Sequence, residues 1–250
     1  ARDEPRLRLR ALHVDHGRLV AAASLRDAAV RLAGQCGVSL AVLAIRVDAG
    51  AGEGVEAAAR AARYAALSAA LAPGEALVTA HHREDQAETV LLQLLRGAGL
   101  RGLAAMPAVA SLGAGWLVRP LLDVPRAVLL EYAATHGLPW TDDPMNADPR
   151  YDRAYLRAEV WPHVVARWPA AAETLARSAR HAAEAQQLVD AVAGADAAPL
   201  VRGGSGAGGA EHEQAGQSRA GPASPAVLKG LEPLAQAGKQ GAEDGRRHVQ

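Results

Sequence analysis

Titratable side chains gather in the segment AHHREDQAET, at residues 80–89. A short apolar run precedes it and apolar residues recur at helical spacing after it, which predicts a strand, a turn and a helix through Leu95. At that spacing His81, Asp85 and Glu88 occupy positions i, i+4 and i+7, on one face. Carboxylates beside a histidine suit a hard cation such as Mg²⁺ or the recognition of an ammonium group. Ordinary ion pairs on a solvated helix face are the alternative that spacing leaves open.

Two other segments place polar residues where they could join this group. One follows an apolar run at 9–14, and the other lies on an alanine-rich segment at 55–71. In an open α/β sheet the carboxyl ends of the strands meet at one edge, where ligands bind. A turn residue or a surface helix charge is the ordinary alternative for each one. The candidates are Asp15, His16, Gly17, Arg60 and Arg63.

A third polar segment, WTDDPMNADPRYDRAYLR at 140–157, combines arginines with aromatic rings. Arg150, Arg153 and Arg157 are spaced by three and four residues, so they project from one helix face with tyrosines nearby. Arginine interleaved with aromatic rings suits phosphate backbones and unstacked bases. The aspartates and asparagine of this loop also fit helix caps and turns, which is the simpler explanation for them.

Apolar patterns predict the elements that must position these residues. Strands are expected at 9–14, 38–45, 76–80 and 116–119, and helices at 24–36, 55–71 and through Leu95. Strand 38–45 is continuously apolar, which is typical of a strand covered on both faces. Alternating strands and helices predict an α/β fold with a Rossmann-like parallel sheet and right-handed crossovers.

From Pro125 onward the pattern changes to helices only, expected at 125–137, 153–166 and 170–192. Residues 96–115 are expected to form a glycine-rich turn and an irregular stretch. Beyond 194 the chain is rich in Gly, Ser, Gln and Pro, which is typical of disorder. The predicted organisation is an α/β domain at 1–124, a helical appendage at 125–193 and a disordered C-terminal tail at 194–250.

Composition excludes several classes of protein. The 27 basic and 27 acidic residues balance, so any nucleic-acid site must be a local patch. The single cysteine, Cys36, excludes a disulfide framework and a cysteine-rich metal site. No run of about 20 apolar residues is present, and no signal peptide opens the chain, so a cytoplasmic protein without a membrane span is expected.

Five motifs, in this order, resemble those of the tRNA(Ile)-lysidine synthases, which are PP-loop ATP pyrophosphatases. They are HVDHG at 13–17, GVEAAARAARY at 54–64, TAHHREDQAETVLLQLLRGAG at 79–99, RPLL at 119–122 and DDPMNADPRYDRAYLR at 142–157. The resemblance implies a PP-loop ATPase fold. It also implies an ATP-dependent reaction that joins free lysine to carbon 2 of the wobble cytidine in the isoleucine tRNA with a CAU anticodon, through an adenylated intermediate.

The resemblance also implies roles for the candidates. Asp15, His16 and Gly17 would border ATP. Arg63, Asp85, Glu88 and His81 would hold or activate lysine near the adenylate, and Asp85 would also be a ligand for Mg²⁺. Arg60, Arg153 and Arg157 would contact the tRNA, with Asn146 ordering their loop. A homodimer is compatible with this assignment.

The chain departs from the family pattern in several places. The Ser-Gly-Gly-X-Asp-Ser phosphate loop is absent, so we expect an N-terminally truncated form of the domain. Glu84 replaces an aspartate, Met145 replaces Ser or Thr, and Ala154 replaces Asn. Two alternatives remain open. One is another PP-loop tRNA-modifying enzyme such as a thiolase, which the single cysteine disfavours; the other is a catalytically inactive RNA-binding fragment.

Overall fold

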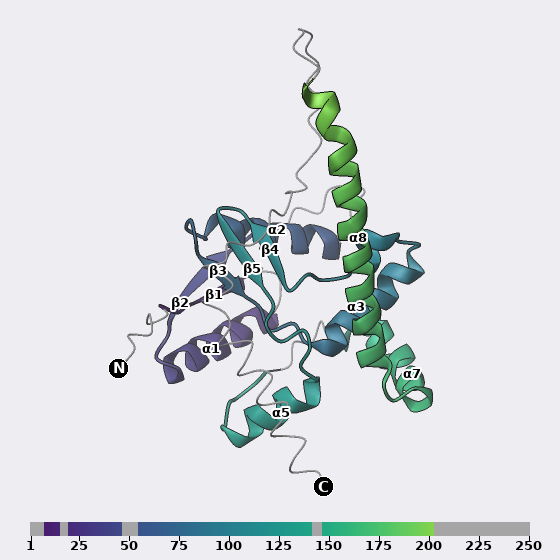
Figure 1. Ribbon diagram of the computed structural model, residues 1–250. Coiled ribbons are helices and arrows are strands. Elements are labelled where there is room, and N and C mark those ends of the chain that lie inside the picture. Colours follow the sequence, from purple (N-terminus) through teal and green to yellow (C-terminus); the bar gives the residue numbers. More distant parts are fainter. Residues whose placement is uncertain (1–7, 16–19, 47–54, 142–146, 203–250) are drawn as a thin grey trace, which may run out of the picture.

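The structure is a computed structural model that describes residues 8–15, 20–46, 55–141 and 147–202 (Figure 1). The strands are β1 (Arg10–Asp15), β2 (Ser39–Ala44), β3 (Ala76–Val78), β4 (Val109–Leu112) and β5 (Gly115–Val118). The helices are α1 (Val20–Gln35), α2 (Val55–Ala69), α3 (Arg83–Leu95), α4 (Leu100–Leu103), α5 (Arg126–Thr135), α6 (Asp152–Tyr155), the π-helical η2 (Leu156–Val160), α7 (Trp161–Arg167) and α8 (Ala171–Arg202).

The strands form two narrow sheets within the described residues. β1 pairs with β2 in parallel, and β3 pairs with β5 in parallel, which confirms the predicted α/β fold with parallel strands. β4 pairs antiparallel with β5, although its residues were expected to be irregular. Gly113 makes this hairpin possible because its φ of +56° fits the tight turn between the two strands. Figure 1 shows α1 and α2 on opposite sides of the strands.

The first sheet differs from its prediction in one respect. The run 38–45 was expected to be covered on both faces, but β2 is largely exposed or half-exposed and Val42 is 43% exposed. The prediction was wrong because β1 and β2 make a two-stranded sheet, and a pair has two edges and little interior. The second sheet is better covered, since Leu117 and Val118 of β5 are buried.

The helical part begins at α5, which follows Pro125 at its N-cap. The helix expected at 153–166 is three consecutive segments, α6, η2 and α7. Pro162 explains the interruption, because a proline inside a continuous helix cannot donate the backbone hydrogen bond to residue 158. A wide π-helical turn just before Pro162 accommodates the loss of this backbone hydrogen bond. The same turn carries Arg157.

The long helix α8 packs against α3 and α4 and extends beyond them at its far end (Figure 1). Ala171, Ala176 and Ala179 of α8 are buried, and small side chains at these positions let two helix backbones approach closely. The helix continues through Arg202, so the predicted start of the tail at 194 is too early. Residues 203–250 lie outside the described residues.

Among the described residues, none of the helices combines the length and the apolar character that crossing a membrane requires. The division of the chain at 124 and 125 stays a prediction. A hydrogen bond crosses that boundary, because the Arg126 N–H donates to the Glu84 carboxylate. On the near side of the boundary, the Arg83 N–H donates to the Val124 carbonyl.

Candidate functional site

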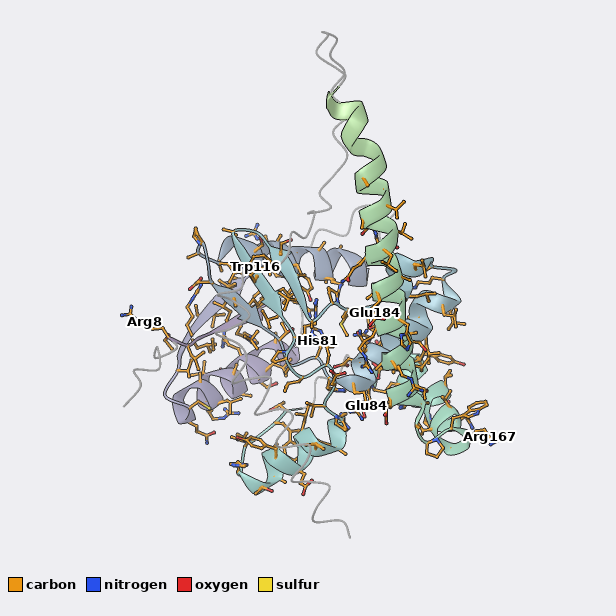
Figure 2. All side chains as sticks on the ribbon, viewed as in Figure 1. Arg8, His81, Glu84, Trp116, Arg167 and Glu184 are labelled. Atoms are coloured by element: carbon orange, nitrogen blue, oxygen red, sulfur yellow. The ribbon has the colours of Figure 1, made fainter. Side chains whose placement is uncertain are left out.

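The candidate site lies at the carboxyl ends of β3 and β5, where the sheet gives way to α3. The parallel pairing of these strands continues one step further, because the Thr79 N–H donates to the Val118 carbonyl at 2.9 Å. Thr79 and Arg119 therefore follow their strands side by side. The Thr79 hydroxyl lies 2.9 Å from Nδ1 of His81, which fixes the imidazole beside the same edge. Figure 2 shows His81 in the centre of the molecule.

His81 was predicted to share a helix face with the two carboxylates, but α3 begins two residues later. His82 is the N-cap, and its backbone N–H donates to the Asp85 carboxylate at 3.1 Å, as in the reciprocal half of a capping box. Nε2 of His82 also lies 3.3 Å from Asp85. The first turn of α3 therefore holds Asp85 in place, while His81 approaches the site from the preceding extended segment.

Glu84 turns the other way from Asp85 at the same helix end. Its carboxylate lies 3.0 Å from Nδ1 of His82 and accepts a hydrogen bond from the backbone N–H of Arg126 at 2.8 Å. Burial raises the pKa of Glu84, but these hydrogen bonds outweigh burial, so the pKa lies below its usual value. Figure 2 shows Glu84 at the end of α3 that faces α5, so this carboxylate joins the two helices.

Glu88 is the most deeply buried charged residue of the site, with 1% of its surface exposed. Arg157 donates to both of its carboxylate oxygens, from Nε at 2.8 Å and from Nη2 at 2.7 Å. Nη2 also lies 3.2 Å from Asp85. Arg153 completes the group, with Nε 3.6 Å from Glu88 and Nη2 donating to the Thr89 hydroxyl at 2.6 Å. A buried carboxylate needs such partners because its desolvation is costly.

The predicted lysine-side carboxylates and two of the predicted tRNA-side arginines are thus partners of each other. The hydrogen bond to Glu88 raises the pKa of Arg157 above its usual value, against the opposing effect of burial. Both arginines keep part of their side-chain surface exposed, 32% for Arg153 and 40% for Arg157. In this structure both arginines hold the η2 region against α3.

The pKa of His81 is shifted downward, in the opposite direction from the pKa of Arg157. Burial lowers its pKa, and the positive charge of Arg119 lowers it further, while Asp85 opposes both effects and Arg153 and Arg60 add to them. A lowered pKa keeps the imidazole uncharged at neutral pH, where one ring nitrogen can accept a proton. The site therefore combines a neutral base with fixed cations and a pair of carboxylates.

Only one of the two predicted α2 arginines reaches this environment. The Arg60 guanidinium lies 5.0 Å from the centre of the Tyr64 ring, and its charge acts on both His81 and Arg119. Arg60 and Arg63 are both exposed, but none of the described contacts joins Arg63 to His81, Asp85 or Glu88. The helix thus places Arg60, predicted for tRNA, nearer the site than Arg63, predicted for catalysis.

Three of the predicted residues lie outside the described residues: His16, Gly17 and Asn146. Asp15 ends β1, the first strand of the other sheet. Across the described part of the chain, none of the groupings of His, Cys, Asp and Glu has three members placed to hold a metal ion. Asp85, the predicted ligand for Mg²⁺, is contacted by Arg157 in this structure.

Sequence reasoning missed three residues that complete the site. His82 caps α3, Thr89 accepts a hydrogen bond from Arg153, and Arg119 is a buried arginine at the end of β5. The signal for Arg119 was present in the sequence, because a charged residue directly follows the apolar run Trp116 to Val118. Spacing alone gave no signal for Thr89, because its partner lies 64 residues away.

Gln86 anchors this arrangement to the rest of the fold. Its buried amide donates to the Met106 carbonyl and accepts from the Met106 N–H, each at 3.0 Å. The paired bonds fix α3 against the segment that follows α4. The first turns of α3 are therefore held on both sides, which limits how far Asp85 and Glu88 can move.

Over the regions that align, curated relatives are about 50% identical to this chain. A tRNA(Ile)-lysidine synthase of Alkalilimnicola ehrlichii is 50% identical over 192 residues, covering 77% of this chain and 43% of the relative. The Methylococcus capsulatus synthase is 51% identical, covering 74% and 42%, and that of Pseudomonas aeruginosa is 48% identical, covering 78% and 44%. The chain thus spans less than half the length of these relatives.

A solved structure and a family model agree on the fold. The U34-tRNA thiolase NcsA from Methanococcus maripaludis, solved with its 4Fe-4S cluster, aligns with a TM-score of 0.54 at 15% identity. The alignment covers 68% of this chain and 60% of the thiolase. The model of the PP-loop domain matches residues 1–164, which is well over half of the chain. The chain therefore belongs to the PP-loop domain family.

Proposed function

We propose that this chain is the nucleotide-dependent part of a tRNA(Ile)-lysidine synthase. The reaction is the ATP-dependent joining of lysine to carbon 2 of the wobble cytidine in the isoleucine tRNA with a CAU anticodon. The observation that carries the proposal is the identity of about 50% with synthases of this name over three quarters of the chain. The carboxylate pair on α3, which already holds a cation, is the feature of the site that fits this chemistry.

Asp85 and Glu88 are the groups that would receive the lysine side of the reaction. A carboxylate pair neutralises an ammonium group and orients it, which raises the effective concentration of the amine at the reacting carbon. In the structure the guanidinium of Arg157 contacts both carboxylates. The lysine ammonium would therefore share the two carboxylates with Arg157. Alternatively, it would displace the Arg157 guanidinium from Asp85, whose oxygen lies farther from the guanidinium than the oxygens of Glu88 do.

His81 is the better base for the attacking amine. An amine must lose a proton before or during attack, and a base with a pKa near the working pH serves this step. The lowered pKa of His81 leaves its imidazole uncharged, whereas both oxygens of Glu88 are engaged by Arg157. Asp85, Glu88 and His81 thus remain the proposed catalytic residues, and His81 is the one that accepts the proton. Arg60 replaces Arg63 as the α2 arginine of the site.

ATP supplies the adenylyl group that makes the cytidine carbon reactive, and Asp15, His16 and Gly17 are proposed to border it. Mg²⁺ in such sites is held by one or two carboxylates together with substrate phosphates, so a single ligand such as Asp85 is enough from the protein. Arg153, Arg157 and Asn146 are proposed to contact the tRNA, and Arg153 and Arg157 keep exposed side-chain surface beside their contacts with Glu88. Cytoplasmic location and a homodimer stay predictions.

Incorporation of labelled lysine tests this function in the complete product of the gene that encodes this chain. We expect label in the isoleucine tRNA when ATP and Mg²⁺ are present, and none in an elongator methionine tRNA that shares the CAU anticodon. Asp85→Asn and Glu88→Gln should each lower incorporation by about tenfold or more, because each removes one charge-assisted contact.

Asp190→Asn is the matched control, since Asp190 pairs with Arg101 on the exposed side of α8. It should incorporate lysine at the rate of the unsubstituted protein. Absence of lysine label in the unsubstituted protein would contradict the proposal, and label from a sulfur donor would favour the thiolase alternative instead. Equal rates for Asp85→Asn and Asp190→Asn would remove Asp85 from the site.

A further inference from the structure

Arg119 is a buried charged residue that none of the described carboxylates neutralises. It follows β5 directly, and 6% of its surface is exposed. Its backbone N–H donates to the Ala108 carbonyl at 2.8 Å, and its Nη1 donates to the Pro107 carbonyl at 2.7 Å. Nε is buried and finds no acceptor among the described residues. A buried N–H without an acceptor is rare in a folded protein, so it calls for a reason.

The groups that act on the pKa of Arg119 are a tyrosine and a second arginine, with no carboxylate among them. Burial lowers its pKa, the phenol of Tyr64 raises it, and the charge of Arg60 lowers it again. The charge of Arg119 in turn acts on His81, which lies at the same strand edge. Two arginines and a neutral histidine thus converge at the carboxyl ends of β3 and β5. A fold stabilised without a ligand would gain little from this arrangement, because like charges repel.

We propose that Arg119, together with Arg60, forms an oxyanion-binding subsite at this edge of the sheet. The Pro107 carbonyl accepts a hydrogen bond from Nη1, which fixes the orientation of the planar guanidinium and leaves Nε as the donor without an acceptor. Because Nε is buried, side chains beside it would have to move for a ligand oxygen to reach it. Arginine presents two parallel N–H groups to carboxylate and phosphate oxygens, and such charge-assisted bonds are strong in a buried place. The bound oxyanion would satisfy Nε and relieve the repulsion between the two arginines.

Two oxyanions fit this description: the phosphates of a nucleotide and the α-carboxylate of an amino acid. Naming these two rests on the proposed function, whereas the subsite itself rests on Arg119. Either oxyanion, bound by Arg119, would lie near the predicted reaction centre, because Arg119, Thr79 and His81 share one strand edge. If the oxyanion is the α-carboxylate, the subsite would hold the end of lysine that does not react, and Asp85 and Glu88 would hold its ammonium side. If it is the nucleotide, the subsite would hold the phosphates, from which pyrophosphate leaves.

Calorimetric titration of the full chain with pyrophosphate, L-lysine and L-lysinamide tests the subsite. Arg119→Met keeps an unbranched side chain and removes the guanidinium with its charge, and it should weaken oxyanion binding by about 30-fold, as expected for hydrogen bonds to a charged group. Loss of pyrophosphate binding alone identifies the phosphate source. Loss of lysine binding with lysinamide binding unchanged identifies the carboxylate source.

Arg119→Lys separates a point charge from a planar donor, because lysine keeps the charge but cannot offer two parallel N–H groups. It should restore part of the pyrophosphate binding and little of the carboxylate binding. Arg101→Met is the control, since Arg101 is an exposed arginine of α4 paired with Asp190. It should bind all three probes as the unsubstituted chain does.

Thermal unfolding distinguishes a binding role from a structural one. Arg119→Met should melt at the same temperature as the unsubstituted chain or higher, because an unpaired buried charge is removed and the exposed Pro107 carbonyl can take water. A clearly lower melting temperature would assign Arg119 to the fold and overturn the proposal. Unchanged affinities in Arg119→Met, or no binding of either oxyanion by the unsubstituted chain, would overturn it as well.

These results are independent of the lysine-incorporation assay. A chain that binds oxyanions through Arg119 but incorporates no lysine would retain the subsite and lose the proposed function. A protein that incorporates lysine with unchanged kinetics after Arg119→Met would retain the function and lose the subsite.

Discussion

At the residue scale, the site depends on one buried carboxylate. Glu88 is nearly inaccessible to water, and both of its oxygens accept hydrogen bonds from Arg157. Arg153 lies further away, at 3.6 Å. Removing one partner of such a pair destabilises a protein more than replacing both partners, because the remaining charge stays buried without a counter-charge. Arg157 is therefore a structural residue in this conformation, whatever it contacts when RNA is bound.

Arg157→Ala tests this role. It removes two hydrogen bonds from Glu88, so the free energy of unfolding should fall by about 1–3 kcal/mol, the usual cost of leaving a buried polar group poorly paired. Arg150→Ala is the matched control, because the Arg150 side chain is 82% exposed and its pair with Asp148 is at the surface. That change should cost less than about 0.5 kcal/mol. Urea unfolding measures both, and equal midpoints would contradict the assignment.

At the scale of elements, two short segments fix where the site residues stand. The turn at His82 and Asp85 starts α3, and the hairpin between β4 and β5 places Arg119. Gly115 is essential to the second segment, because a Cβ there would lie within contact distance of the Glu75 carbonyl oxygen. The Trp116 N–H donates to that same carbonyl at 2.9 Å, so it has little freedom to move.

Gly115→Ala should therefore destabilise the chain by about 1–3 kcal/mol, since an added methyl group in a filled place displaces backbone. Gly34→Ala is the control: it lies on α1 with nothing within 4 Å of an added Cβ, and alanine favours helix over glycine. We expect the control to be neutral or more stable by up to about 1 kcal/mol. Thermal or urea unfolding compares the stability of the two variants. If Gly115→Ala left the free energy of unfolding unchanged, the hairpin would be shown to shift and make room for the methyl group.

At the scale of the whole molecule, α8 joins the helical part to the α/β part. It packs on α3, the helix that carries Asp85 and Glu88, and on α4. The surface ion pairs Arg101–Asp190 and Arg180–Asp123 add little, because exposed pairs are weak. The buried alanines of α8 carry the contact instead, and Ala179 is 1% exposed.

Ala179→Leu should separate α8 from its neighbours, because an overpacked position costs about 1–3 kcal/mol. The displacement should also reach α3 and raise amide hydrogen exchange in its first turns. Leu188→Ala is the control on the same helix, where the side chain is 70% exposed, and it should change neither quantity. Unaltered exchange in α3 after Ala179→Leu would show that α8 does not support the site.

Local pattern was sufficient for much of the fold. Continuous apolar runs located β1, β2, β3 and β5, and apolar recurrence at three and four residues located α1, α2, α3 and α5. The hairpin strand β4 was missed because it has only four residues and the turn after it, Gly113-Ala114, is not of the Asn-Gly kind. The end of α8 was placed too early because the composition changes before the helix ends.

The sequence by itself determined which titratable residues follow β3 and that Asp85 and Glu88 share a helix, since backbone geometry fixes spacing along one element. Tertiary structure decided their partners. The Glu88 carboxylate meets Arg157, 69 residues away, and Arg119 is buried without a described carboxylate. Such meetings depend on how helices and strands pack, and a buried charge takes the partner that packing brings to it. No spacing rule within one element contains that information.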